Sequence, residues 1–438
     1  MKMKFIYRTI IILFLGVLIT GCESFVGGDI NADPNNPVSV PVSAQLPAFQ
    51  LMLSGVYGGD FSAFSCMLAQ QVEGVARQWS SFNQYTGLTP NRFDAAWNSI
   101  YENILNETKI ARANAIESGL NHHKAIIDLT EAFALIIAAD VWDDIPYSQA
   151  LQGIDELNPT YDPQSDIYST AIGFIDGAIS LLNGPVGNIS PGGEDVFYGG
   201  NAAAWIKAAT GLKARVMLHL GDYTQAQALA ASSLESADDN WNYFYPDINS
   251  AGPWYRFNRD REGDIEFHPH MRAMMEGFND SNRLALFDQI FNPANTYLSP
   301  DWEQELLTYR EMQFIIAESA LRNGDNATAH EAFLNGIKGS FDFLDVEGFD
   351  DYVAQESVNP GADGLTLEHV ITQKYISLFL DFEIYNDFRR TGIPSLTPVS
   401  GSSVPVRWDY PAIEYLFNAN SPAEGSVNIA TDRVGWNR

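Results

Sequence analysis

The fold of this chain is decided by two short stretches, Gly221-Asp222-Tyr223-Thr224-Gln225-Ala226 and Gly324-Asp325-Asn326-Ala327-Thr328-Ala329. Each stretch places a Gly where one helix can end and an Asp where its side chain can cap the next helix. Each then places a small Ala where two helices must approach closely. Pro146-Tyr147-Ser148-Gln149-Ala150 is a weaker third copy. Because the copies are unevenly spaced, the sequence predicts a few helical hairpins separated by long insertions.

Helical periodicity extends this pattern over most of the chain. Strand-like alternation is scarce, whereas apolar residues recur at intervals of three and four. The short Gly-Asp connections are typical of tetratricopeptide-like repeats. We therefore predict an all-α fold made of tetratricopeptide-like helical hairpins with long irregular loop insertions. The predicted helices cover residues 97–116, 124–140, 166–182, 203–220, 223–236, 303–323, 326–343 and 367–389.

The N-terminus has the features of an export signal. Lys2 and Lys4 precede an apolar run over residues 10–19, which is too short to span a bilayer stably. Cys22 directly follows Gly21 and resembles the acylated Cys of the bacterial lipobox. We therefore expect Cys22 to carry lipid and to become the first residue of the mature protein. A plain signal peptide with a coincidental Cys is the alternative.

Three segments follow from this interpretation. Residues 1–21 are the expected lipoprotein signal peptide, and residues 22–48, rich in Gly, Asn, Asp, Pro and Ser, are the expected flexible lipid-anchored tether. Residues 49–438 are expected to form one helical domain. Beyond the signal there is no apolar stretch long enough to cross a membrane. We therefore expect the protein to be anchored to the membrane by lipid, not to span it.

Charge and cysteine content restrict the possible partners. The 438-residue chain has 55 acidic and 25 basic residues, a formal net charge of −30. This balance argues against nucleic acid and anionic lipid surfaces as partners. The second cysteine, Cys66, lies among Phe61, Phe64 and Met67, so we expect a buried structural thiol and not a nucleophile.

Several further segments form an ordered set along the chain. They are Asp29-Ile30-Asn31-Ala32-Asp33-Pro34-Asn35-Asn36-Pro37, Trp97-Asn98-Ser99-Ile100-Tyr101, Trp142-Asp143-Asp144-Ile145-Pro146-Tyr147, Trp205 to Arg215, Gln373 to Pro394, and Val406-Arg407-Trp408-Asp409-Tyr410-Pro411. This set resembles the SusD-like subgroup of the SusD/RagB family of nutrient-binding outer-membrane lipoproteins. In the third segment, Asp143 stands where the family has Gly.

The resemblance implies a surface-exposed, lipid-anchored protein of the cell outer membrane. Such a protein binds nutrient, often oligosaccharide, and delivers it to a SusC-like TonB-dependent transporter. The resemblance also implies that the helical repeats mainly face the transporter, while ligand binds on irregular insertions. The charged C-terminal residues Glu383, Asp387, Arg389 and Arg390 are interpreted as a structural ion-pair network near a helix end.

Two aromatic insertions have the chemistry expected of a sugar site. Sugars present apolar faces edged with hydroxyl groups, so they need flat aromatic rings beside amide, carboxylate or guanidinium groups. Residues 79–92 and 254–261 combine both kinds of side chain. The candidate ligand-binding residues are Trp79, Phe82, Tyr85, Arg92, Trp254, Tyr255 and Arg256. These aromatic side chains either contact the ligand or pack onto the helical scaffold.

Other functions remain as alternatives. A repeat scaffold that binds a peptide or protein on its helical face would have buried aromatic loops and exposed grooves between hairpins. A glycoside hydrolase would use two carboxylates, but no pair is marked out among 55 acidic residues. His122-His123 and His268-Pro269-His270 are weak candidates for metal ligands. The sequence contains no nucleotide-binding or catalytic motif, and we expect no cofactor and no catalytic activity.

Overall fold

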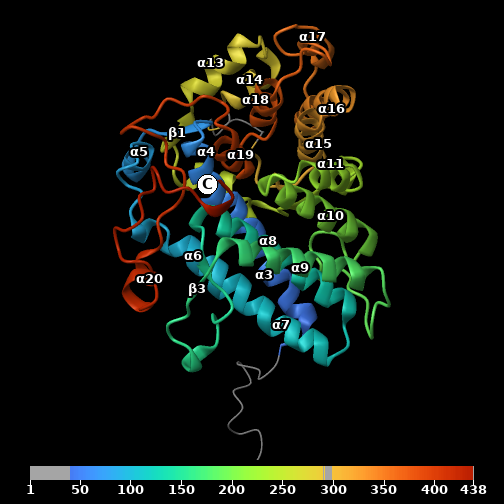
Figure 1. The fold of residues 1–438 in the computed structure, drawn as a ribbon, viewed down its shortest axis with the longest axis vertical. Coiled ribbons are helices and arrows are strands. Elements are labelled where there is room, and N and C mark those ends of the chain that lie inside the picture. Colours follow the sequence, from blue (N-terminus) through green and yellow to red (C-terminus); the bar gives the residue numbers. More distant parts are fainter. Residues whose placement is uncertain (1–39, 290, 292–297, 438) are drawn as a thin grey trace, which may run out of the picture.

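The computed structural model describes residues 40–289, 291 and 298–437. Most of these residues are helical, which confirms the predicted all-α class (Figure 1). The α-helices are α3 (Val42–Val56), α4 (Ser62–Leu68), α5 (Arg77–Asn83), α6 (Asp94–Ile100), α7 (Asn106–Glu117), α8 (Asn121–Trp142), α9 (Gln164–Leu182), α10 (Ala202–His219), α11 (Tyr223–Ala231), α12 (Pro253–Asp260), α13 (Pro269–Gly277), α14 (Ser281–Phe287), α15 (Tyr309–Asn323), α16 (Asn326–Leu344), α17 (Phe349–Val353), α18 (Leu367–Ser377), α19 (Glu383–Thr391) and α20 (Ala412–Phe417).

Shorter elements connect these helices. The π-helical segments are η2 (Tyr57–Phe61) and η4 (Tyr101–Leu105), and the 3-10 turns are η3 (Pro90–Arg92), η5 (Gly153–Asp155), η6 (Ala237–Asp239), η7 (Ile248–Ser250) and η8 (Gly435–Asn437). The strands are β1 (Val72–Gly74), β2 (Ile145–Pro146), β3 (Tyr161–Asp162), β4 (Trp241–Phe244), β5 (Ile265–Phe267) and β6 (Glu303–Leu307). In the described part of the chain, these strands form three antiparallel pairs, β1–β5, β2–β3 and β4–β6.

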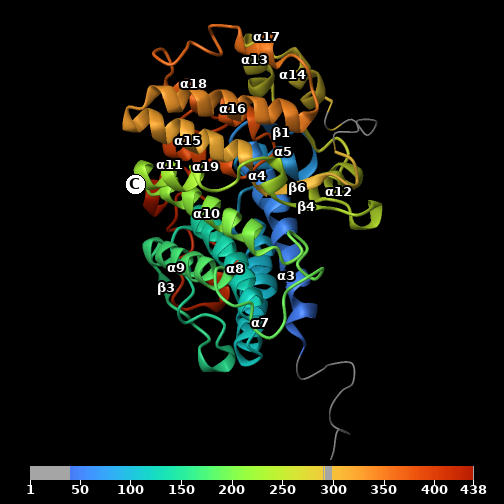
Figure 2. The same ribbon diagram turned by 90° about the vertical axis from the view of Figure 1, so that its right-hand side faces the viewer.

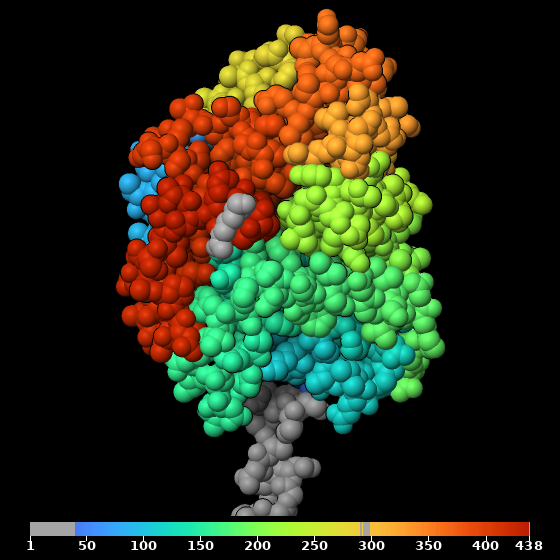
Figure 3. All heavy atoms as spheres, viewed as in Figure 1, coloured from blue at the N-terminus to red at the C-terminus, as the bar shows by residue number. Residues whose placement is uncertain are grey.

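The helical hairpins form a stack. Figure 2 shows α7, α8, α9, α10, α11, α15 and α16 following one another from one end of the molecule towards the other. The first described helix, α3, and the insertion containing α12 and β4 lie along one side of this stack. In Figure 3, the C-terminal segment covers another part of the surface beside the stack. The stack is therefore the scaffold, and the insertions supply the remaining surface.

Both Gly-Asp connections have the predicted geometry. Gly221 and Gly324 have φ values of 77° and 83°, which a Gly adopts without steric cost. The Asp222 carboxylate accepts a hydrogen bond from Gln225 N at 3.0 Å, and Asp325 accepts one from Thr328 N at 3.1 Å. The next residues of the pattern, Ala226 and Ala329, are completely buried at the helix contacts. The predicted hairpins α10–α11 and α15–α16 are therefore confirmed.

The third copy is not a hairpin turn. After α8 ends at Trp142, the chain forms β2 and a long loop before α9 begins at Gln164. Tyr147 N and Ser148 N both donate hydrogen bonds to the carboxylate of Asp162, at 2.8 and 2.7 Å. This carboxylate fixes the segment as a loop beside β3, so no second helix follows the copy directly.

Two predicted helices have different boundaries. Residues 303–307 form β6, because they pair with β4 in a register that joins Trp241 to Leu307. The segment 367–389 is divided into α18 and α19, with Leu380 at φ 65° between them. The side chain of Gln71 stabilises this break, since Leu380 N donates to its Oε1 at 2.9 Å and its Nε2 donates to Tyr375 O at 2.7 Å. These long-range contacts override the local helical spacing.

The folded body begins earlier than the sequence predicts. Residues 42–48, expected as the end of the tether, form the first turns of α3. Val42, Leu46, Phe49 and Leu53 share one face of the helix and are buried, so core packing overrides the Pro-rich composition. The signal peptide, Cys22 and residues 23–39 of the predicted tether lie outside the described residues. Within the described part, no helix has the length and apolarity needed to cross a membrane.

The predicted C-terminal ion-pair network is present in part, because Asp387 and Arg390 belong to one network. Asp387 Oδ2 lies 2.7 Å from Lys374 Nζ, and Asp387 also pairs with Arg390 at 2.8 Å. Arg390 makes two bonds to Glu318, at 2.5 and 2.6 Å. All four side chains are at least nine-tenths buried. The other two predicted members, Glu383 and Arg389, make different contacts. Glu383 instead pairs with His219 and Arg215, and Arg389 donates hydrogen bonds to Asn386 and to the backbone carbonyl of Asp140. Cys66 is completely buried, as predicted, and burial raises the pKa of its thiol.

Candidate functional site

A strand pair brings the two predicted sugar-binding segments together. Strand β1 leads into α5, and β5 follows α12. Their antiparallel pairing joins Val72 to Phe267 and Gly74 to Ile265. As a result, the aromatic residues of α5 and α12 meet although they are far apart in the sequence. Phe257 and Trp79 form an edge-to-face contact with ring centres 4.9 Å apart.

Next to this contact is a groove of about 800 Å³, which we call the α3/α12 groove. It is lined by α3, η2, Trp79 of α5, the middle of α6, β4, and α12 with the residues on either side. The volume is within the range of small-molecule binding sites. Of the seven candidate ligand residues, Trp79, Trp254 and Arg256 line the groove.

The two tryptophans form the wall of the groove and not projecting platforms. Trp79 is 4% exposed and stacks on Phe64, with ring centres 5.5 Å apart. Trp254 is 5% exposed, and its indole Nε1 donates a hydrogen bond to Ser62 Oγ at 2.9 Å. Only a small part of each ring is therefore available to a ligand.

The other four candidates do not line the groove. Phe82 is buried and contacts Trp79 edge-to-face. Arg92 lies over the rings of Phe64 and Phe82 and pairs with Asp60 at 2.9 Å. The hydroxyl of Tyr85 accepts a hydrogen bond from Val399 N at 3.2 Å. Tyr255 lies at a narrow gap behind Trp254. These four side chains support the wall from behind or lie beside it.

Sequence reasoning missed one side of the groove, which α3 and η2 supply. Gly55, Gly58, Gly59 and Asp60 all line it. At Gly59 the backbone has ψ −114°, so the helix is interrupted where it passes the groove. Such π-helical interruptions are frequent at functional sites. The Gly58-Gly59 pair inside an apolar helix was the signal that could have identified this side.

The glycines on this side are not equivalent. A Cβ on Gly58 would lie 1.8 Å from Gln304 Oε1, so a larger residue there requires the Gln304 side chain to move. A Cβ on Gly55 would meet no atom within 4 Å. Gly55 therefore faces the open part of the groove and can carry a larger side chain.

Both acidic and basic side chains line the groove. Burial raises the pKa of Asp60, although the pairing with Arg92 acts in the opposite direction. Asp260 pairs with Arg259 at 2.7 Å, and this hydrogen bond lowers the pKa of the carboxyl. Arg256 and Arg261 also line the groove, and their side chains make no ion pair with any described residue.

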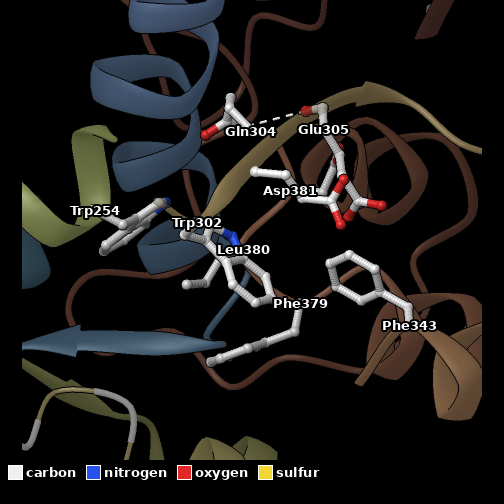
Figure 4. Close-up of a pocket in the computed structure, with 9 residues that line it drawn as sticks. Trp254, Trp302, Gln304, Glu305, Phe343, Phe379, Leu380 and Asp381 are labelled. Carbon is white, nitrogen blue, oxygen red and sulfur yellow. Dashed lines mark hydrogen bonds between the residues drawn. The ribbon is translucent and has the colours of Figure 1, made fainter. Parts of the chain in front are cut away.

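A second hollow lies behind Trp254. Figure 4 shows its lining side chains, with Trp254 on one side and Phe343 on the other. Burial raises the pKa of its carboxyl groups Asp381 and Glu303, each to about 7. The cavity measures only about 30 Å³, which holds one or two water molecules and no sugar ring. It is therefore part of the interior and not a ligand site.

The histidine pairs considered as metal ligands make hydrogen bonds with protein groups. His123 Nε2 lies 3.0 Å from Glu194, and the ring of His268 accepts a hydrogen bond from His270 N at 2.9 Å. Among the described residues, the one group with metal-ligand spacing is Asp140, His219 and Glu383. Burial lowers the pKa of His219, but the two carboxylates raise it to about 9. The imidazole is therefore protonated at neutral pH, and its positive charge balances the negative charge of Asp140 and Glu383.

Comparisons with known proteins agree with this architecture. A family model described as SusD-like, "Starch-binding associating with outer membrane", matches residues 35–297 and 288–411. No curated protein matches the chain.

Solved structures of similar fold cover nearly the whole chain. A SusD/RagB family protein from Bacteroides thetaiotaomicron is 20% identical with a TM-score of 0.73, covering 91% of this chain and 99% of its own. A chitin-binding protein is 21% identical with a TM-score of 0.73, covering 91% and 100%. A SusD homologue from Bacteroides fragilis is 18% identical with a TM-score of 0.74, also covering 91% and 100%. At these identities, the similarity establishes the fold.

Proposed function

Because the chain belongs to the SusD-like family, we propose that it binds oligosaccharide in the α3/α12 groove and delivers it to a SusC-like TonB-dependent transporter. The family consists of nutrient-binding proteins associated with the outer membrane, and not of enzymes. The chain is therefore a binding protein of this class. Its ligand, its site and its partner are the parts that we propose.

One observation carries the choice of site. Two segments with sugar-binding chemistry, distant in the sequence, converge on one groove through the β1–β5 pair. The groove combines the rings of Trp79, Trp254 and Phe257 with the polar groups of Asn249 and Arg256. This combination suits a ligand with apolar faces and many hydroxyl groups. The chitin-binding protein of similar fold supports a glycan as the ligand class.

Gly55→Trp tests the site without removing any native contact. The new ring would enter the open groove. Because Gly has a low helix propensity, Trp at this position should not weaken the helix. We expect the variant to remain folded and to bind glycans at least about tenfold more weakly, because the ring occupies the ligand volume. Isothermal titration calorimetry with soluble oligosaccharides of starch, chitin and other glycans measures this effect.

Gly177→Trp is the matched control. Gly177 is an exposed helical Gly of α9 with no atom near its Cβ direction, and it lies outside the groove. Its variant should bind as the unchanged protein does. Equal glycan affinity in Gly55→Trp and Gly177→Trp would exclude the α3/α12 groove as the binding site.

A second candidate function has one observation in its favour. A groove of about 330 Å³ lies between α11, α15 and α16, and most aromatic residues of the insertions are buried. A peptide-binding repeat scaffold would have both features. Asn335 lines this second groove. If Asn335→Trp weakens binding of peptides from a peptide panel, and Gly55→Trp leaves glycan and peptide binding unchanged, the peptide function replaces the glycan function.

The proposed anchor is the lipid on Cys22, with residues 1–21 removed as the signal peptide. Membrane attachment next to the transporter would keep the binding domain at the cell surface. Cys22→Ser should release the protein from the outer-membrane fraction, as measured by cell fractionation and immunoblotting. Retention of the variant in that fraction would exclude lipid anchoring at Cys22.

A further inference from the structure

We propose that the α3/α12 groove selects anionic oligosaccharides, and that Arg256 and Arg261 bind their carboxylate or sulfate groups. This inference rests on the function proposed above and names the ligand class of the same site. It follows from the distribution of charge in and around the groove.

The groove has an excess of positive charge in a strongly acidic protein. Its acidic lining residues are Asp60 and Asp260, and each already pairs with an arginine that does not line the groove. Arg256 and Arg261 line the groove, are exposed, and make no ion pair with a described residue. Two positive charges are thus left for a ligand, whereas the whole chain has a net charge of −30. In a protein of this composition, two exposed arginines without an ion pair in one groove are unexpected.

The carboxyl groups beside these arginines are affected by the positive charge. The carboxyl of Asp260 has a lowered pKa, mainly because Arg259 donates a hydrogen bond to it, and Arg256 and Arg261 contribute by charge. On the opposite side, burial raises the pKa of Asp60, whereas Arg92 acts in the opposite direction. Because Asp60 and Asp260 each pair with an arginine that does not line the groove, the balance of charges that a ligand meets is positive.

The position of the arginines suits a glycan with acidic groups. Arg256 lies on α12 between Trp254 and Phe257, whose rings line the same wall. A guanidinium group forms paired, charge-assisted hydrogen bonds with carboxylate or sulfate, and these bonds are stronger than bonds to hydroxyl groups. Attraction to the helix C-terminus accounts for a basic residue in the last turn of α12, such as Arg259, but not for Arg256 in the middle of the helix.

Matched pairs of oligosaccharides isolate the contribution of charge. The purified full chain in detergent is titrated calorimetrically with tetragalacturonate and its methyl ester, and with a sulfated galactan tetrasaccharide and its desulfated form. The neutral member of each pair keeps the sugar chain and loses the charge. We expect the charged member of at least one pair to bind about tenfold more tightly than its neutral form.

The variant Arg256→Ala/Arg261→Ala should abolish this preference. Its affinity for the charged member should fall about tenfold, to the level of the neutral member, and its affinity for the neutral member should stay within about twofold. Arg272→Ala is the control, because Arg272 is a partly exposed cation on α13 that pairs with Asp288 and does not line the groove. The control should keep the preference.

The results that overturn the inference differ from those that overturn the proposed function. If neutral glycans bind as tightly as charged ones and Gly55→Trp weakens them, the site stands and the anionic selectivity is wrong. If the preference persists in Arg256→Ala/Arg261→Ala, the two arginines do not produce it and the inference also fails. If no glycan binds in the groove, both proposals fail.

Discussion

The arginines of the interior and those of the α3/α12 groove illustrate two uses of the same side chain. Arg215 is 1% exposed and forms two hydrogen bonds to the carboxylate of Glu311, at 2.7 and 2.6 Å. Its charge is further balanced by Glu383, 3.6 Å away. Arg256 and Arg261 are exposed and have no such partner among the described residues.

This difference separates residues that hold the fold from residues that can bind a ligand. A buried charge is tolerated only when a partner of opposite charge replaces its lost hydration. Consequently, Arg215 is occupied by Glu311 and is not available for a ligand. An exposed arginine keeps its hydration until a ligand displaces the water, so its charge contributes to binding and little to folding. The contrast predicts opposite consequences of mutation in the two regions.

The largest effect is expected for Arg215→Met. The substitution keeps an elongated apolar stem but leaves Glu311 buried without its cation, which typically costs about 3–5 kcal/mol. Urea denaturation, followed by circular dichroism, measures the loss of unfolding free energy. The double variant Arg215→Met/Glu311→Met should recover part of it, because no carboxylate remains at position 311. A loss below about 1 kcal/mol in the single variant would contradict the structural role assigned to the interior arginine.

A somewhat smaller effect is expected from pH, through His219 in the same interior region. Burial lowers the pKa of His219, but Glu383 and Asp140 raise it to about 9, above the ordinary value of 6.5. The resulting stabilisation is fully present below pH 6.5 and is lost as pH rises through 9. The shift corresponds to roughly 3 kcal/mol.

The pH effect is isolated by comparison with His219→Gln, which cannot titrate. The buried carboxyl of Asp381, whose pKa is raised to about 7, titrates in both proteins and cancels in the difference. Unfolding free energies measured from pH 6 to 10 should converge as pH rises. A constant difference between the two proteins over this range would show that the protonated imidazole does not stabilise the fold.

Two alanines of α11 provide a further contrast, between a buried and an exposed position of one helix. Ala226 is completely buried where α11 meets α15, so Ala226→Leu should cost about 1–3 kcal/mol by overpacking. Ala228→Leu is the control, because Ala228 is an exposed residue of the same helix. Thermal unfolding monitored by circular dichroism compares the two variants. Equal midpoints would mean that the helix contact adapts to the larger side chain.

Local signals predicted the hairpins correctly, and long-range contacts account for most of the differences. The caps at Asp222 and Asp325 depend on residues three positions apart, so their effect is visible in the sequence. The strand β6 depends on pairing with β4, about sixty residues earlier in the chain. The periodicity of residues 303–307 could not reveal that partner.

The candidate site was predictable in its segments but not in the exposure of its side chains. Trp79 and Trp254 line the groove, as their sequence context suggested, but they are almost entirely buried. Their burial follows from contacts with Phe64 and Ser62, which lie in a different segment.

Asp143 shows that a substituted motif position can keep its conformation. Its φ is 75°, which explains why the family has Gly there. Gly435 N donates a hydrogen bond to Asp143 Oδ1 at 2.6 Å, and Arg407 lies 3.6 Å from the same carboxylate. These contacts, made with the C-terminal segment, hold the carboxylate in place and are not evident from the motif alone.

The smallest effect on stability is expected for the arginines of the α3/α12 groove. Arg256→Ala/Arg261→Ala removes two charges that have no partner in the described fold, so the free energy of unfolding should change by less than about 0.5 kcal/mol. Urea denaturation under the conditions used for Arg215→Met provides the measurement. A loss above about 1 kcal/mol would indicate that these arginines stabilise α12, and reduced ligand affinity could then reflect a damaged site. Unchanged stability together with a lost preference for charged glycans would assign the groove arginines to binding, because a folding defect could not produce that combination.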